Sequence, residues 1–125
     1  MVSIQMDEME EIKMSISQSH LEEEFKWFHS HPELSFEEFE TTKRVRQLLE
    51  NAGIEILDLP LRTGLVAVIR GDESGPTIAI RTDIDALPIQ EKTSLAYRSL
   101  RSDVMHACGH DFHLTSVYGA ALQLH

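Results

Sequence analysis

The stretch LVAVIRGDESGPTIAIRTDIDALP, Leu65 to Pro88, decides the expected fold of this chain. It contains two short runs rich in branched aliphatic residues, LVAVIR and TIAIR, separated by the turn-forming segment GDESGP. Together with the earlier run IEILDL, at residues 54–59, they predict three strands, because branched aliphatic side chains suit a pleated, half-buried surface. Pro88 cannot donate a backbone hydrogen bond, so any strand ends there.

Two helices are expected before these strands. The N-terminal residues have apolar side chains at mixed helical spacings with a weak middle near SISQS, which predicts a frayed extension and then a firmer helix from about Ser19. Pro32 ends this helix. Ser35 and Glu38 match a capping box at the start of a second helix, and Gly53 is its expected C-terminal cap.

A last helix is expected after the strands. From Asp111, a candidate N-cap, apolar residues recur at helical spacing: Leu114, Val117, Tyr118, Ala121 and Leu122. Residues 89–104 look irregular, and no element is predicted there. The order of helices, strands, loop and helix predicts an α/β fold without internal repeats. A chain of 125 residues is long enough for one modest domain.

The composition is that of an ordinary globular protein, with 42% hydrophobic and 26% charged residues and a net charge of −10. Without a basic stripe to neutralise phosphates, we expect no nucleic-acid partner. The sequence contains no run of about 18 apolar residues, so no membrane-spanning helix is expected. The acidic N-terminus does not resemble a secretory signal. A cytoplasmic location is therefore expected. It agrees with the single cysteine, Cys108, which cannot form a disulfide within the chain.

Three of the seven histidines and the only cysteine fall in MHACGHDFH, residues 105–113. Cys108 and His110 are separated by Gly109, and residues two apart in an extended segment point to the same side, so thiol and imidazole can share a metal ion. Further ligands must come from elsewhere. The candidates are His29, His31, Asp83, Asp85, His106, Asp111 and His113. Alternatively, Cys108 is a buried free thiol beside histidines that cap or line a helix start.

A second polar cluster is RTDIDALP, residues 81–88. Asp83 and Asp85 lie where a strand leaves the predicted sheet, the usual position of catalytic and ligand-binding groups in open α/β sheets. In the alternative interpretation, both aspartates turn or cap the chain before Pro88, with Arg81 as an ion partner.

Four motifs, in this order, resemble the N-terminal part of the M20 family of metallopeptidases: HSHPELSFEEFETT, RTGLVAVIRG, AIRTDIDALPIQEKT and MHACGHDFHLTSVYGAA. They are most similar to its amidohydrolase branch, which includes hippurate hydrolase, N-acyl-amino-acid amidohydrolases, N-acetyldiaminopimelate deacetylase and plant auxin-conjugate hydrolases. The resemblance implies that residues 21–125 are the N-terminal part of a zinc-peptidase-like α/β/α catalytic domain, incomplete because the lid domain and C-terminal half are absent. Residues 1–20 are expected to be an N-terminal extension.

The resemblance also implies roles for individual residues. The Cys and His of the HACGH motif bind a pair of metal ions in this branch, so Cys108 and His110 are the expected ligands, with the thiolate bridging the ions. Asp83 matches the active-site aspartate, which orients a ligand and raises its basicity. Arg81 stands where other branches have a metal-binding histidine, so no ligand is inferred there. The remaining histidines are expected at a helix start or pocket wall (His106, His113) or in a surface loop (His29, His31).

The implied reaction is hydrolysis of the amide bond of a small N-acyl amino acid. Two divalent ions, of zinc, manganese, cobalt or nickel, polarise the carbonyl and activate water. The general base in the family is a glutamate in a Glu-Glu pair downstream of the HACGH motif, and no such pair follows the motif in these 125 residues. As a truncated amidohydrolase, the chain is therefore expected to be inactive alone.

Two alternatives from other classes stay open at the level of sequence. In the first, the chain is a non-catalytic remnant whose uncovered strand edges and apolar surface bind a partner or a second copy, giving a homo-oligomer. In the second, Cys108 is a redox-active or nucleophilic cysteine that nearby imidazoles activate.

Overall fold

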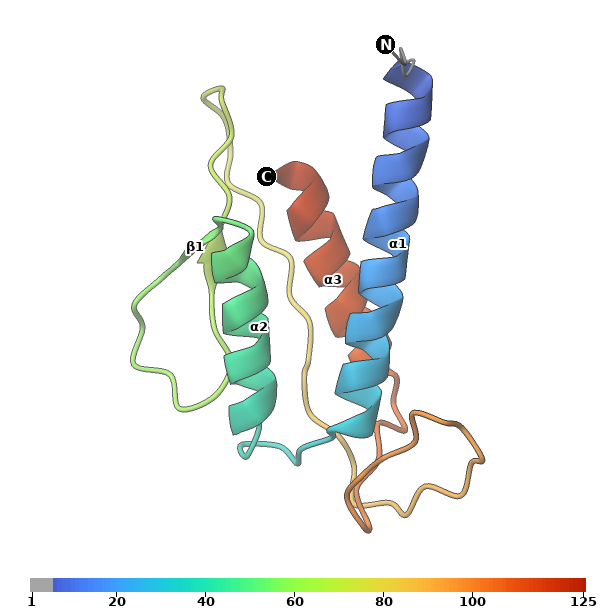
Figure 1. Ribbon diagram of the computed structural model, residues 1–125. Helices are drawn as coiled ribbons and strands as arrows, with labels where there is room; N and C mark the ends of the chain where they lie inside the picture. The colour runs from blue at the N-terminus through green and yellow to red at the C-terminus, as the bar shows by residue number, and fades with distance from the viewer. Residues whose placement is uncertain (1–5) are drawn as a thin grey trace.

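The computed structural model describes residues 6–125. Along the chain the elements are α1 (Met6–Ser30), α2 (Phe39–Asn51), β1 (Glu55–Ile56), β2 (Ala67–Val68) and α3 (His110–Leu124). Figure 1 shows α1 packed beside α3, with the extended chain that follows β2 running between α2 and α3. None of the helices in residues 6–125 is both long and apolar enough to cross a bilayer.

The three helices enclose one hydrophobic core. Phe28 of α1 is almost completely buried and packs with Leu48 and Leu49 of α2 and with Leu114 and Tyr118 of α3. Val45 is three and four residues before Leu48 and Leu49 in α2, and Leu114 is four residues before Tyr118 in α3, so each of these two helices turns one apolar face to the core.

α1 and α3 approach closely at Gly119. A Cβ atom added there would lie 2.9 Å from Cδ1 of Leu21, so a glycine permits this packing distance. With the two helices side by side, the C-terminal end of α1 meets the N-terminal end of α3 (Figure 1). A direct contact between His29 and Asp111 joins these two ends.

α1 is longer than the sequence predicts. It begins at Met6 rather than near Ser19, and it continues without a break through the SISQS stretch, so the predicted frayed extension is wrong over these residues. Gln18 and Ser19 lie on the exposed side, where serine and glutamine are tolerated in a helix. The helix ends at Ser30, before Pro32, as expected. The boundary between residues 20 and 21 falls inside this helix and stays a prediction.

The start of α2 differs from the predicted capping box. Ser35 is exposed in the turn before the helix, and Glu38 makes no side-chain capping bond. The buried carboxylate of Glu33 instead accepts hydrogen bonds from the N–H of Glu40 (3.1 Å) and from the N–H (2.6 Å) and hydroxyl (2.7 Å) of Thr41. The capping box fails because a carboxylate outside the local pattern satisfies the free N–H groups of the first turn.

At the other end of α2, Gly53 has a φ of 77° and donates its N–H to the carbonyl of Glu50 (3.0 Å). The predicted C-terminal glycine cap is therefore confirmed. A positive φ strains a residue that carries a Cβ, so this position favours glycine.

Two of the three predicted strands form. β1 and β2 make an antiparallel pair, with Glu55 opposite Val68. The third run, TIAIR, is extended but belongs to no strand, and its Ile78 and Ile80 are 83% and 62% exposed. A strand needs a neighbour for its backbone hydrogen bonds, and within residues 6–125 no segment pairs with this run.

Residues 89–104 contain no helix or strand, as the sequence predicts. α3 then begins at His110, after Gly109, whose φ of 81° is left-handed. Asp111 therefore lies inside the first turn and is not the N-cap. Its carboxylate accepts the N–H of Phe112 (2.9 Å) and also contacts α1, which removes it from the predicted capping role.

Candidate metal centre

The two polar motifs singled out in the sequence lie next to each other. Leu87 and Met105 exchange two backbone hydrogen bonds of 2.9 and 3.0 Å and form an antiparallel bridge. This bridge brings the end of RTDIDALP alongside the beginning of MHACGHDFH. Residues from both motifs can therefore contribute to one site.

His110, the first residue of α3, is held by Asp85. Its Nδ1 lies 3.0 Å from both the carboxylate Oδ1 and the backbone oxygen of Asp85. Both partners are acceptors, so Nδ1 carries the proton and donates. Within the described residues, Nε2 makes no hydrogen bond, and its lone pair is available. A histidine that donates one N–H to a carboxylate and offers its other nitrogen is the usual form of a metal-ligating imidazole.

Cys108 lies in the loop just before α3, and its side chain is exposed and unbridged. The alternative of a buried free thiol is therefore wrong. A thiolate and a neutral imidazole suit zinc and related divalent ions. They do not complete a site, because within residues 6–125 no group of three or more His, Cys, Asp or Glu side chains is placed so that it could hold a metal ion. The donors present fit part of a metal centre.

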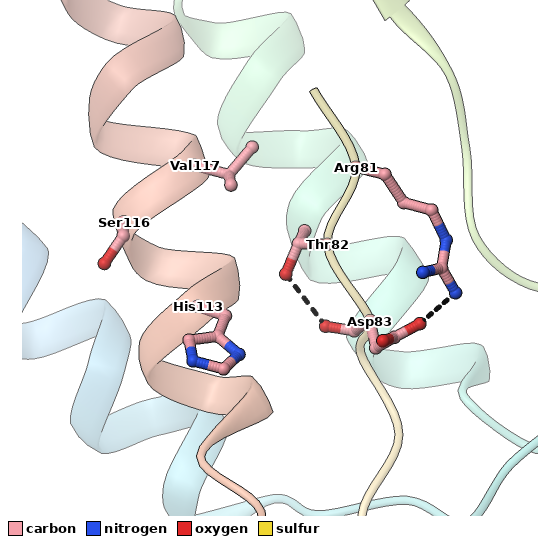
Figure 2. Close-up of a pocket in the computed structure, with 6 residues that line it drawn as sticks. All are labelled: Arg81, Thr82, Asp83, His113, Ser116 and Val117. Atoms are coloured by element: carbon pink, nitrogen blue, oxygen red, sulfur yellow. Dashed lines mark hydrogen bonds and ion pairs between the residues drawn. The ribbon is translucent and has the colours of Figure 1, made fainter. Parts of the chain in front are cut away.

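Asp83 lies on the extended segment, and its carboxylate pairs with the guanidinium of Arg81. This contact agrees with the alternative interpretation of the cluster. Figure 2 shows both side chains on the side of the segment turned away from α3, whereas Thr82 points toward the helix. In the described part of the chain, no hydrogen bond or ion pair joins Asp83 to Cys108 or His110.

A hollow of about 300 Å³ lies between this segment and α3. It is lined by Arg81, Thr82, Asp83, His113, Ser116 and Val117 (Figure 2). His113 thus lies at a pocket wall, and its ring centre is 6.1 Å from that of His110. His106 differs, because it is buried and neither of its ring nitrogens has a hydrogen-bond partner within residues 6–125. Burial is the largest influence on His106 and lowers its pKa, which favours the neutral imidazole.

His29 is not in a surface loop, which corrects the prediction for this residue. It belongs to α1 and is buried between two carboxylates. Its Nδ1 lies 2.7 Å from Oδ2 of Asp111, and its Nε2 lies 3.0 Å from Oε1 of Glu91. The loop prediction fails because α1 extends up to Ser30 and turns this side chain toward α3. His31 is half-buried and stacks on Trp27.

In the network of His29, Glu91 and Asp111, a positively charged imidazole lies between two carboxylates. Both nitrogens of His29 face carboxylates, so both donate and the imidazole is protonated. Burial alone would lower the pKa of His29, but the hydrogen bonds and charges of Glu91 and Asp111 raise it above 6.5. Burial would raise the pKa of Glu91, but the N–H of Ser99, the hydroxyl of Thr93 and His29 lower it from 4.5 to about 2.

These pKa shifts predict a pH dependence of folding stability. His29 stabilises the fold below pH 6.5, and this contribution is lost as the pH rises through its raised pKa. Glu91 stabilises the fold above pH 4.5, and this contribution is lost as the pH falls toward about 2. We expect the metal-free chain to be most resistant to urea between pH 4.5 and 6.5.

The control is His29→Gln, which should flatten the decline on the alkaline side. The other titratable side chains that face His29 are Tyr97 and His106. An alkaline decline of the same steepness in His29→Gln would assign it to other groups.

Comparison with known proteins supports the family resemblance of the four motifs. The model of peptidase family M20/M25/M40 matches residues 79–125, which contain both polar motifs. A solved structure, the Bacillus subtilis YXEP protein, described as a dinuclear metal binding peptidase from the M20 family, superposes with a TM-score of 0.87 and 54% identity over 88% of this chain and 31% of that chain. The chain belongs to peptidase family M20. Both the resemblance of the four motifs and the predicted α/β fold are confirmed.

Two curated relatives of this M20 chain are named as a deacetylase and a carboxypeptidase. The N-acetylcysteine deacetylase of Bacillus subtilis (strain 168) is 61% identical over 97 residues, 77% of this chain and 26% of the relative. Thermostable carboxypeptidase 1 of Saccharolobus solfataricus is 44% identical over 97 residues, 77% of this chain and 25% of the relative. The chain thus spans about a quarter of the length of the curated relatives it matches.

Two features of the centre are not predicted from the sequence. Asp85, rather than Asp83, contacts His110, and the only signal for it is that two aspartates on an aliphatic segment need partners. Glu91 has no local signal at all, because it lies in an irregular loop and meets His29 from a distant part of the chain.

Proposed function

We propose that this chain supplies Cys108 and His110 to a two-metal centre that hydrolyses the amide bond of small N-acyl amino acids. The observation that carries the proposal is the 3.0 Å hydrogen bond from His110 Nδ1 to Asp85, which leaves Nε2 available two residues from the exposed Cys108 thiol. The relatives support the substrate class, since one of them is N-acetylcysteine deacetylase. N-acetylcysteine is therefore the first substrate to test.

Each residue has a defined part in this proposal. Bound divalent ions, of zinc, manganese, cobalt or nickel, would polarise the amide carbonyl and activate water. Cys108 would bind as the thiolate and His110 as the neutral imidazole, oriented by Asp85. Asp83 would orient a further ligand, which requires its carboxylate to exchange Arg81 for that ligand. A reducing compartment keeps such a thiol free, so we also propose a cytoplasmic location.

The described residues do not contain a full set of ligands. A catalytic zinc ion takes about three protein ligands, whereas this chain offers two at the centre. The general-base glutamate of the family pattern is not among them. We therefore propose that the 125 residues alone bind metal weakly and do not hydrolyse N-acyl amino acids.

A chimaera tests this function. The matching residues of this chain would replace the 97 aligned residues of the Bacillus subtilis N-acetylcysteine deacetylase. We expect the metal-loaded chimaera to deacetylate N-acetylcysteine and to lose this activity when a chelator removes the metal. Asp83→Asn and Cys108→Ser in the chimaera should each abolish most of the turnover.

The control is the parent enzyme, assayed with the same substrate and metal. A folded, metal-loaded chimaera that hydrolyses no N-acyl amino acid would refute the proposed function. So would full activity in the Cys108→Ser chimaera.

Self-association is the second candidate function, and one observation favours it. Ile78 and Ile80 are largely exposed on an extended segment without a backbone partner in residues 6–125. Such a segment can pair with another copy of itself. Sedimentation and thermal unfolding of the 125-residue chain test this role. A stable monomer that melts cooperatively would exclude it.

A further inference from the structure

The network of His29, Glu91 and Asp111 has no part in the proposed reaction. The three side chains are 9%, 1% and 3% exposed. A protonated imidazole buried between two carboxylates gains little over apolar packing, because the desolvation of the charges offsets much of their attraction, although removing one of the charged partners destabilises the fold. Apolar side chains of similar volume at these positions would stabilise the fold equally well. The network therefore points to a geometric requirement at this place in the fold.

The geometry concerned is the first turn of α3. Asp111 directly follows His110. One of its carboxylate oxygens lies 2.7 Å from Nδ1 of His29, and the other accepts the N–H of Phe112 at 2.9 Å. A single carboxylate thus ties the start of α3 to the end of α1. The ring of His110 is held separately by Asp85.

Glu91 links the loop that precedes α3 to the imidazole of His29. Its Oε1 lies 3.0 Å from Nε2 of His29 and accepts the hydroxyl of Thr93 at 2.6 Å, while its Oε2 accepts the N–H of Ser99 at 2.5 Å. The residues that lead into the motif with Cys108 are therefore anchored on the side chain that also fixes α3.

We propose that His29 is a positioning residue of the metal centre: by holding Asp111 and Glu91 together, it fixes the first turn of α3 and with it the direction in which His110 presents Nε2. The inference rests on the proposed role of His110 as a metal ligand. His29 itself contacts no ligand, and it acts through Asp111.

The test compares His29→Gln with the unchanged 125-residue chain by NMR of nitrogen-labelled histidine side chains, without metal. Both N–H donors of a glutamine side chain are on a single nitrogen, and its oxygen only accepts, so it cannot donate in two directions to Asp111 and Glu91 as the two ring nitrogens of His29 do. We expect His110 to be a single Nδ1–H tautomer in the unchanged chain and an averaged mixture in His29→Gln. The apparent cobalt(II) affinity should fall by about 10–100-fold, the range for residues that support ligands.

The matched control is Glu24→Gln. Glu24 is another buried charge on α1, and it accepts two hydrogen bonds from Arg44, of 2.7 and 2.9 Å, away from the start of α3. We expect this variant to lower the melting temperature as His29→Gln does, while the His110 tautomer and the cobalt affinity stay unchanged. Equal effects of both variants on His110 would reduce His29 to a structural role and overturn the proposal.

A double variant keeps the proposal testable if His29→Gln alone fails to fold. In His29→Gln with Glu91→Gln, the new amide at 29 can donate to Asp111 and accept from the amide at 91, which restores the chain of hydrogen bonds with Asp111 as its one charged member. We expect the single His110 tautomer to return. A double variant that stays unfolded or keeps the averaged tautomer contradicts the proposal. If the unchanged chain binds no cobalt but shows the tautomer effects, only the proposed function has failed.

Discussion

Replacing Cys108 by serine is expected to abolish the sulfur-to-metal charge-transfer absorption that the chain develops with cobalt(II). In the chimaera, the cobalt affinity should fall by about 100-fold or more, because residues that merely support a ligand already contribute about 10–100-fold. Serine cannot replace the sulfur, since its hydroxyl stays protonated where a coordinated thiol ionises. An absorption titration at constant pH measures both quantities.

Asp85→Asn is expected to have a smaller effect on metal binding than Cys108→Ser in the same titration. It retains an acceptor for the N–H of His110 but loses the charge, so the sulfur band should persist while the affinity falls by about 10–100-fold. Circular dichroism should show that both variants keep their helices. The assignment of Cys108 fails if the unchanged chain shows no sulfur band at saturating cobalt, or if serine leaves the chimaera's affinity intact.

Glu33→Ala is expected to destabilise the fold by about 3 kcal/mol. Hydrogen bonds to a charged partner contribute about 1.5–3 kcal/mol each, and an unsatisfied buried donor costs about 1–3 kcal/mol. The alanine variant removes the acceptor of three hydrogen bonds and leaves two N–H groups and the Thr41 hydroxyl unpaired. Urea unfolding of the metal-free chain measures the change.

Ser35→Ala separates this prediction from the capping box expected from the sequence. Ser35 is exposed, so its removal should change the free energy of unfolding by less than about 0.5 kcal/mol. Glu33→Gln should have an intermediate effect, because its amide offers one acceptor where the carboxylate offers two. A larger loss in Ser35→Ala than in Glu33→Ala would show that the helix start depends on the local motif.

The sequence predicts those parts of the fold that depend on local chemistry. The apolar face of α3, the stop before Pro32 and the glycine turn at Gly53 follow from side-chain spacing and backbone preference. The cap at Glu33 and the unpaired TIAIR run do not, because each depends on which distant segment lies beside it. A strand pattern records the preference of a segment, whereas a strand also requires a partner.

In the candidate centre, too, some features follow from local sequence and others depend on distant segments. The ordered motifs identify the family and draw attention to Cys108 and His110, and two aspartates on an aliphatic run indicate that at least one needs a partner. The choice of Asp85 over Asp83 depends on the bridge between Leu87 and Met105. The burial of His29 depends on the packing of α1 beside α3, which no spacing within α1 can indicate.

X-ray absorption at the zinc edge tests the metal centre most directly. With one zinc ion bound to the 125-residue chain, we predict a sulfur neighbour at about 2.3 Å and an imidazole nitrogen at about 2.0–2.1 Å. The sulfur neighbour should vanish in Cys108→Ser, and the imidazole contribution should diminish in His110→Ala. A zinc environment of oxygen and nitrogen alone, unchanged when Cys108 is replaced, would contradict the assignment of Cys108 and His110 as its ligands.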